Sequence, residues 1–150
     1  MLIRLTKDDI TKEYNKILGV LDASIPHYYG KDTPGWKWNA FVQMMLDNLQ
    51  VWKLVWPISS EDPSLECVGY LITRIYQDDI FLQRFMLIYG VQLYKQMPVE
   101  FWIKCETQLE ELARQAFCTR IEAYEDNERV VDISVNAGYM KKFRSVKLLV

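Results

Sequence analysis

The sequence predicts an α/β fold in which helices cover both faces of a twisted, mixed but mostly antiparallel sheet. Three segments rich in β-branched and aromatic residues follow one another with short polar turns between them: Val51–Ile58, Cys67–Tyr76 and Ile80–Ile88. Such short connections favour antiparallel neighbours. A long helical pattern that begins at Pro98 then leads to a fourth strand candidate, Cys118–Tyr124. A strand reached through a crossover helix lies parallel to the strand before that helix, which makes the sheet mixed.

The chain begins with a short strand candidate, Leu2–Thr6, followed by a helix. Thr6, Asp8 and Asp9 favour a helix start, because Thr and Asp side chains accept the unpaired N–H groups of a first turn. Apolar residues then recur at helical spacing on one face: Ile10, Tyr14, Ile17, Leu18 and Leu21. Pro26 is expected to end this helix.

The segment from Pro26 to Trp38 is predicted to be a loop, because it holds two Pro and two Gly residues. It also carries four aromatic residues and the single histidine of the sequence. A second amphipathic helix is expected after it, from the spacing of Trp38, Phe41, Val42, Met45, Leu46 and Leu49.

The strand candidate Ile80–Ile88 is apolar on both faces apart from Gln83 and Arg84, so we expect it to be central and covered twice. Pro98 suits the first turn of the following helix, where its missing N–H costs nothing. A short helix over Glu128–Val135 and a final strand over Phe143–Val150 complete the predicted order.

The length indicates one domain over residues 1–150. The composition argues against nucleic acid, metal ions and membranes as partners. The net charge is −2 and no run of Lys or Arg exceeds two residues, which argues against nucleic acid. The three cysteines match no zinc or redox spacing, so no metal is expected. No apolar stretch approaches 18 residues and the first residues lack the apolar run of a signal peptide. We therefore expect a cytoplasmic protein without a membrane partner.

The order of these elements, from the first strand to the last, resembles that of the GNAT N-acyltransferases. Three segments carry the resemblance: Ile3-Arg4-Leu5-Thr6-Lys7-Asp8-Asp9-Ile10 is similar to the family's opening, Val68-Gly69-Tyr70-Leu71 to its third strand, and Asn127 with Asn136-Ala137-Gly138-Tyr139-Met140-Lys141-Lys142 to its ending. The resemblance implies transfer of an acyl (acetyl) group from acetyl-CoA, or another acyl-CoA, to the amine of a small molecule or a protein.

The resemblance also implies where acyl-CoA would bind. Pantetheine would bond to the backbone of the strand at Ile80–Ile88, and the pyrophosphate would lie on the next turn and the helix N-terminus. The implied cofactor-binding residues are Ile88, Tyr89, Tyr94, Lys95, Gln96 and Asn127. In this family the turn carries two small residues, usually Gly, but the matching window, Leu93–Pro98, contains none. A transferase therefore requires N–H groups of Tyr94–Pro98 that converge on one point.

The resemblance places the remaining site residues by position. Ser134 stands where many members carry a Tyr that protonates the leaving thiolate, and Glu122 is a substitute for the family's Glu base. The acceptor would meet His27, Tyr28, Tyr29 and Trp36 in the first loop. A second interpretation of these aromatic residues stays open, in which they pack as a lid on the core and His27 is a hydrogen-bonded packing residue.

A second function also stays open: a non-catalytic descendant of the fold. It would act as a binding or structural module through protein contacts at the aromatic loop or an exposed sheet edge. A homodimer also stays open. In a non-catalytic descendant, Tyr94, Met97 or Trp102 would fill the place of the pyrophosphate.

Overall fold

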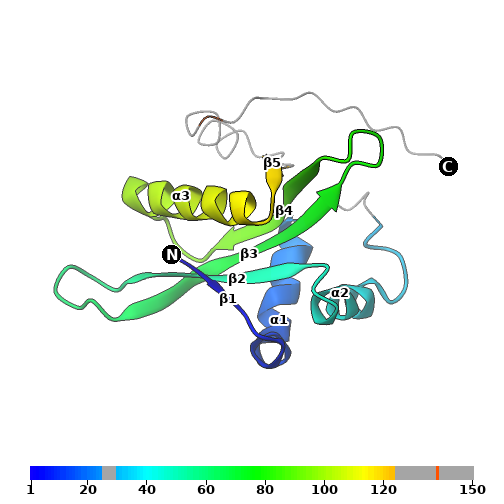
Figure 1. The fold of residues 1–150 in the computed structure, drawn as a ribbon. Coiled ribbons are helices and arrows are strands. Elements are labelled where there is room, and N and C mark those ends of the chain that lie inside the picture. The colour runs from blue at the N-terminus through cyan, green and yellow to red at the C-terminus, as the bar shows by residue number, and fades with distance from the viewer. Residues whose placement is uncertain (25–29, 124–137, 139–150) are drawn as a thin grey trace.

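The computed structural model describes residues 1–24, 30–123 and 138. In this part of the chain the strands form one five-stranded sheet in the order β1-β2-β3-β4-β5 (Figure 1). Neighbouring strands are antiparallel except β4 and β5, which are parallel, so the predicted mixed sheet is confirmed. The elements are β1 (Leu2–Arg4), α1 (Lys7–Ser24), α2 (Trp36–Met45), β2 (Gln50–Pro57), β3 (Leu65–Gln77), β4 (Arg84–Leu93), α3 (Val99–Gln115) and β5 (Cys118–Ala123).

Helices cover both faces of the sheet, as the sequence predicts. α1 and α2 lie on one face and α3 on the other (Figure 1). Two apolar clusters fill these interfaces. The α1 face buries Leu5, Ile10, Ile17, Val20, Leu21, Met44, Leu49, Val51, Tyr70 and Ile72. The α3 face buries Leu2, Trp52, Leu54, Val68, Leu71, Met86, Met97, Phe101, Leu109 and Ala113.

The start of α1 confirms the predicted cap. The backbone N–H of Asp9 donates to the Thr6 hydroxyl at 3.2 Å, and the backbone N–H of Thr6 donates to the Asp9 carboxylate at 3.2 Å. This reciprocal capping arrangement satisfies N–H groups that the helix itself cannot pair.

The predicted strand Ile80–Ile88 is shifted in the structure. Its central position between β3 and β5 is confirmed, but β4 begins at Arg84 and continues to Leu93. Ile80, Phe81 and Leu82 are exposed, so the prediction that they are covered twice is wrong. The Asp78 carboxylate explains the difference, because it accepts the N–H groups of Ile80 at 2.9 Å and Phe81 at 2.8 Å. This side chain holds the segment as a turn instead of a strand.

The first loop is shorter than expected, because Trp36 is the first residue of α2 and not a loop residue. Trp36 packs against the α1-face cluster. Trp38, in the same helix, is exposed and stacks on Phe41 at a ring distance of 5.6 Å. The lid interpretation therefore fits Trp36.

Several predictions fall outside the described residues. These are the helix at Glu128–Val135, the strand at Phe143–Val150 and the site residues His27, Tyr28, Tyr29, Asn127 and Ser134. Among the helices that the structure describes, none has the length and apolarity needed to cross a membrane.

Candidate functional site

A bulge in β4 marks the point where the sheet changes. On β3, Ile72 lies opposite Gly90 and Thr73 lies opposite Ile88, so Tyr89 is an extra residue on β4. The parallel pairing with β5 is described up to Ile88, which lies opposite Ala123. β4 continues to Leu93 in register with β3 alone, within the part of the chain that the structure describes. The bulge thus lies next to the last described pair of β4 and β5, and bulges are typical of strands that turn backbone groups toward a site.

Helix α1 closes the sheet just beyond the bulge. A Cβ atom added at Gly90 would lie 3.0 Å from the Cβ of Ser24, so glycine allows the helix end to approach the strand. The Ser24 hydroxyl donates to the carbonyl of Val91 at 3.2 Å. This contact fixes β4 against the end of α1.

Backbone N–H groups at both ends of the turn after β4 are already paired within the protein. The N–H of Tyr94 donates to the carbonyl of Val68 at 2.8 Å, and the N–H of Phe101 donates to the carbonyl of Pro98 at 3.1 Å. Pro98 is the N-cap of α3 and has no N–H to offer. Two of the amides near the expected pyrophosphate site are thus already paired and a third is missing.

The charges of this turn differ from the expected phosphate site as well. The Lys95 ammonium is ion-paired with the Glu66 carboxylate on β3. Glu100 adds a negative charge to the first turn of α3. Met97 is 8% exposed and packs into the α3-face core. The turn therefore does not fit a pyrophosphate as it stands.

The other implied cofactor-binding residues lie either at the bulge of β4 or in the turn before α3. Ile88 and Tyr89 lie at the bulge. Tyr94 packs edge-on against Tyr70 at a ring distance of 6.2 Å, and Gln96 lines an open hollow beside the turn. This hollow has a volume of about 440 Å³ and is lined by Trp56, Pro57, Ile58, Ser59, Ser60, Lys95, Gln96, Met97 and Pro98.

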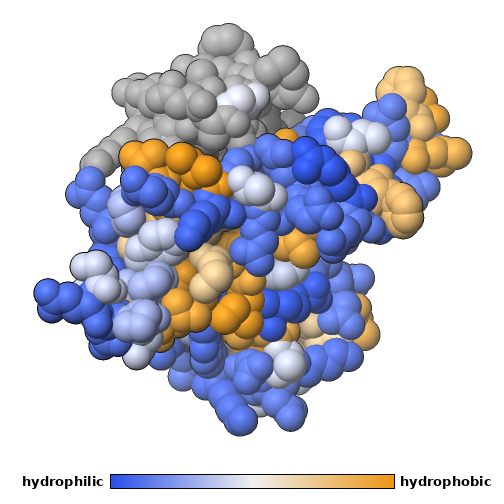
Figure 2. Space-filling model, turned by 60° about the vertical axis from the view of Figure 1, so that its left-hand side comes forward, coloured by the Kyte–Doolittle hydropathy of each residue, from blue (hydrophilic) through white to orange (hydrophobic). Residues whose placement is uncertain are grey.

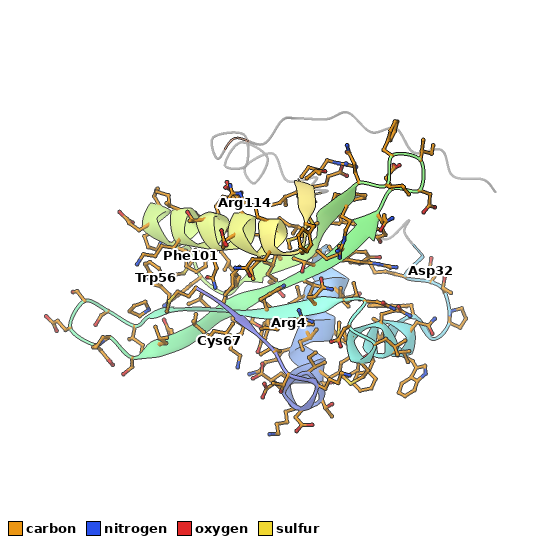
Figure 3. The ribbon with its side chains drawn as sticks, viewed as in Figure 1. Arg4, Asp32, Trp56, Cys67, Phe101 and Arg114 are labelled. Atoms are coloured by element: carbon orange, nitrogen blue, oxygen red, sulfur yellow. The ribbon has the colours of Figure 1, made fainter. Side chains whose placement is uncertain are left out.

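Trp56 forms the aromatic side of the hollow. It meets Phe101 edge-on at a ring distance of 5.5 Å, and the two side chains lie together between β2 and α3 (Figure 3). The Lys104 ammonium lies 5.3 Å from the centre of the Trp56 ring. Two side chains of α3 thus hold Trp56 in place.

A polar cluster that sequence reasoning missed lies on the α1 face. The Glu13 carboxylate accepts from the Lys53 ammonium at 2.6 Å and from the Tyr70 hydroxyl at 2.5 Å. Burial raises the pKa of Glu13, but the hydrogen bonds from Lys53 and Tyr70 outweigh burial and lower it below its ordinary value. Burial, with the hydrogen bond to Glu13, raises the pKa of Tyr70, so this phenol stays a neutral donor. The sequence signal for this cluster was Lys53, a charged residue within an otherwise apolar strand that therefore needs a charged or polar partner.

The candidate base Glu122 lies on β5 opposite Leu87. Its carboxylate accepts from the Arg120 side chain at 2.6 Å. The Arg120 guanidinium also lies 4.4 Å from the centre of the Phe85 ring. The structure therefore places Glu122 beside the bulge as one half of an ion pair. Within the described ranges, no group of three or more His, Cys, Asp or Glu residues could hold a metal ion.

No protein-family model and no curated protein matches this sequence. Solved structures do share its fold. An aminoglycoside acetyltransferase from an uncultured soil metagenomic sample, in complex with sisomicin, has a TM-score of 0.66 and 12% identity, over 100% of this chain and 94% of that one. A ribosomal-protein-alanine N-acetyltransferase from Brucella melitensis biovar Abortus 2308 has a TM-score of 0.63 and 10% identity, over 100% and 99%. A transcriptional regulator from Bacillus halodurans C-125 has a TM-score of 0.65 and 16% identity, over 100% and 99%.

Proposed function

We propose that this chain, which has a GNAT-like acetyltransferase fold, is a divergent N-acyltransferase that moves an acyl group from acyl-CoA to an amine. The fold is the premise and the reaction is the proposal, because one fold can serve several functions. The structural neighbours that act on an aminoglycoside and on a protein alanine suggest a small-molecule or protein amine as the acceptor.

The observation that carries the proposal is the bulge at Tyr89 in β4. Tyr89 is an extra residue relative to β3, and the described pairing with β5 reaches Ile88, which lies opposite Ala123. Backbone amides on the edge of a bulged strand can pair with the amides of an extended ligand. Pantetheine, which carries two amides in a chain, has the chemistry to lie along that edge.

The acyl donor would supply a thioester. The amine nitrogen bonds to the acyl carbon, the carbon–sulfur bond breaks, and the proton released by the nitrogen ends on the thiolate. The chain's own contribution would be to align the donor along β4, with Glu122 accepting the proton through water. Because Arg120 already holds Glu122, we expect positioning to contribute more to catalysis than proton transfer.

A second candidate function is a binding module without acyl transfer. It is favoured by the turn before α3, where Glu66 pairs with Lys95 and no glycine lets the backbone approach a phosphate. A solved structure described as a transcriptional regulator has the same fold, which suggests that the fold can also serve functions other than acyl transfer.

Calorimetric titration of the full chain with acetyl-CoA and with free CoA tests the first proposal. Micromolar binding, with thiol release when spermidine or an alanine-terminated peptide is added, would support the transferase. Absence of heat and of any thermal shift at millimolar acetyl-CoA would refute it and favour the binding module. As a control, 4′-phosphopantetheine alone should retain a large share of the affinity, because the β4 edge and not the turn is expected to hold the donor.

A further inference from the structure

An exposed apolar patch lies at the free end of the β3–β4 hairpin. Ile80, Phe81 and Leu82 are 83%, 73% and 69% exposed. Phe117, which is 80% exposed, lies at the same end of the sheet, because the residue after it pairs with Arg84 at the start of β4. The hairpin projects at the upper right of Figure 1, and Figure 2 shows apolar side chains gathered at the end of a projection at the same height. We call these four apolar side chains the tip patch.

The tip patch is separate from the features discussed for acyl-CoA. It lies where β4 begins, whereas the turn expected to meet the pyrophosphate follows the other end of that strand. Four large apolar side chains at this exposure present on the order of a few hundred Å², which is the size of patch that often marks a contact with a partner.

The backbone of the tip patch is unfavourable for the residues that it carries. Leu82 and Phe117 have positive φ angles of 55° and 58°, in the left-handed region that favours Gly or Asn. Their exposed side chains gain no burial that would offset this strain. Asp78 closes the turn, since its backbone N–H donates to the carbonyl of Gln83 at 2.7 Å. The apolar side chains are therefore held in place before any partner arrives, as is typical of strained residues at binding sites.

The charges around the tip patch are balanced. The hairpin over residues 74–87 and β5 carry three basic and three acidic residues: Arg74, Arg84, Arg120, Asp78, Asp79 and Glu122. An anionic membrane selects a clear excess of basic residues, so this balance argues against a lipid surface as the occupant.

Two of these charged groups are available to a partner on opposite sides of the apolar turn. Asp79 precedes the turn and Arg84 follows it, and neither has an ion-pair partner within the described residues. By contrast, Arg120 pairs with Glu122 at 2.6 Å. A two-fold interface brings the same surface of two copies together, so a surface that offers one group of each sign is complementary to itself.

We propose that the tip patch is the interface of a homodimer, in which the hairpin ends of two copies pack together about a two-fold axis. A stable interface buries about 800 Å² per partner, and the four apolar side chains supply roughly half of that area. The rim supplies the rest, where Asp79 of each copy faces Arg84 of the partner subunit. This dimer does not depend on acyl transfer and holds for either candidate function.

Sedimentation equilibrium of the full chain tests the proposal. We expect a monomer–dimer equilibrium in the micromolar range, and Phe81→Ser should weaken it by at least about tenfold. Ile103→Ser is the matched control, because it changes an apolar side chain on α3 that is 60% exposed, and it should leave the equilibrium unchanged.

The double variant Leu82→Gly/Phe117→Gly separates loss of the interface from loss of folding. Glycine relieves the positive φ angles, so the thermal midpoint should not fall at a concentration where the unmodified protein is monomeric. The same variant should nevertheless fail to dimerise, because it removes two of the four apolar side chains.

A charge exchange tests the symmetry of the interface. Asp79→Arg and Arg84→Asp should each stay monomeric alone, since like charges then face each other, whereas an equimolar mixture of the two should form a heterodimer. The proposal is overturned if the unmodified chain stays monomeric at millimolar concentration, or if its dimer is unaffected by the tip-patch variants. A monomer that binds phosphatidylserine vesicles and loses this binding with Phe81→Ser would overturn it as well, and would assign the tip patch to a lipid surface.

Discussion

The Tyr70 hydroxyl on β3 donates a 2.5 Å hydrogen bond to the Glu13 carboxylate on α1. Together with the Lys53 ammonium, this bond ties the first helix to the middle of the sheet through a polar contact at the edge of the apolar core. Tyr70 itself is 1% exposed, so its hydroxyl gives up its hydrogen bonds to water when the chain folds. Without Glu13, no hydrogen bond in the folded protein would replace them.

Glu13→Leu should therefore destabilise the fold by about 1–3 kcal/mol, because it leaves the Tyr70 hydroxyl without its acceptor and Lys53 without its partner. Urea unfolding at pH 7 measures the loss. Tyr70→Phe removes the hydroxyl itself, so no buried hydroxyl is left without an acceptor, and the loss of stability should be smaller. Equal stability of the Glu13→Leu and unmodified proteins would show that water replaces Glu13 at no cost.

The same carboxylate gives a pH dependence with a definite sign. The folded-state pKa of Glu13 lies below its ordinary value of 4.5, so the unfolded chain binds the proton more readily. The stability that Glu13 contributes is thus present above the unfolded pKa and is lost as pH falls through the folded pKa. Between pH 6 and pH 3 we expect the thermal midpoint of Glu13→Gln to fall less than that of the unmodified protein. Parallel pH profiles for the two proteins would contradict this assignment.

Two glycines should respond in opposite directions to alanine. A Cβ atom at Gly69 would lie 2.0 Å from the carbonyl oxygen of Gln92, which belongs to the paired backbone of β4. A Cβ atom at Gly19, inside α1, would meet nothing within 4 Å. Gly69→Ala should cost about 2 kcal/mol or more, because the strands must move apart. Gly19→Ala should add about 0.5–1 kcal/mol, since alanine favours the helix. Calorimetric unfolding of both variants checks the contrast.

If acyl-CoA binds, the Lys95–Glu66 pair should change its affinity by a small factor. An exposed ion pair is worth about 0.2–1 kcal/mol, so a phosphate can compete with Glu66 for Lys95. Glu66→Gln should tighten CoA binding by roughly two- to fivefold, and Lys95→Met should weaken it by a similar factor. Titration calorimetry measures both. Glu110→Gln, which removes the partner of Arg114 in the same helix, should leave CoA affinity unchanged.

The sequence predicted the order of the elements from β1 to β5 because each one has its own periodicity, and the resemblance to the GNAT fold rested on that order. The limits of β4 were wrong, since the apolar run at Ile80–Leu82 matches a buried strand equally well. A local signal in the sequence favoured a turn instead. Asp78 stands two residues before Ile80, which is the spacing at which an Asp side chain accepts backbone N–H groups and forms a turn.

The candidate site was less accessible to sequence reasoning. The missing glycines before α3 were visible in the sequence, but the capture of Lys95 joins it to Glu66, 29 residues earlier. The Tyr70–Glu13 pair spans 57 residues. Contacts of this kind depend on strand register, and a bulge such as the one at Tyr89 shifts register without any marked change in residue type.

Thr73 offers a final test of how polar groups are held inside the sheet. It is fully buried, and its hydroxyl accepts from the Trp52 ring N–H at 2.9 Å while it donates to the Gln50 side chain at 3.2 Å. Thr73→Val keeps the shape but leaves the indole N–H without an acceptor, so we expect a loss of about 1–3 kcal/mol in urea unfolding. Thr73→Ser, which keeps the hydroxyl, should lose less.

A double-variant cycle separates the lost hydrogen bond from changes in packing. Trp52→Phe removes the N–H, so once Trp52 is Phe the further change Thr73→Val should cost less than it does in the unmodified protein. A coupling near zero between the two positions would mean that the indole N–H finds another acceptor when the hydroxyl is absent. A coupling of about 1 kcal/mol or more would show that the β2–β3 pairing depends on this buried contact as well as on its backbone hydrogen bonds.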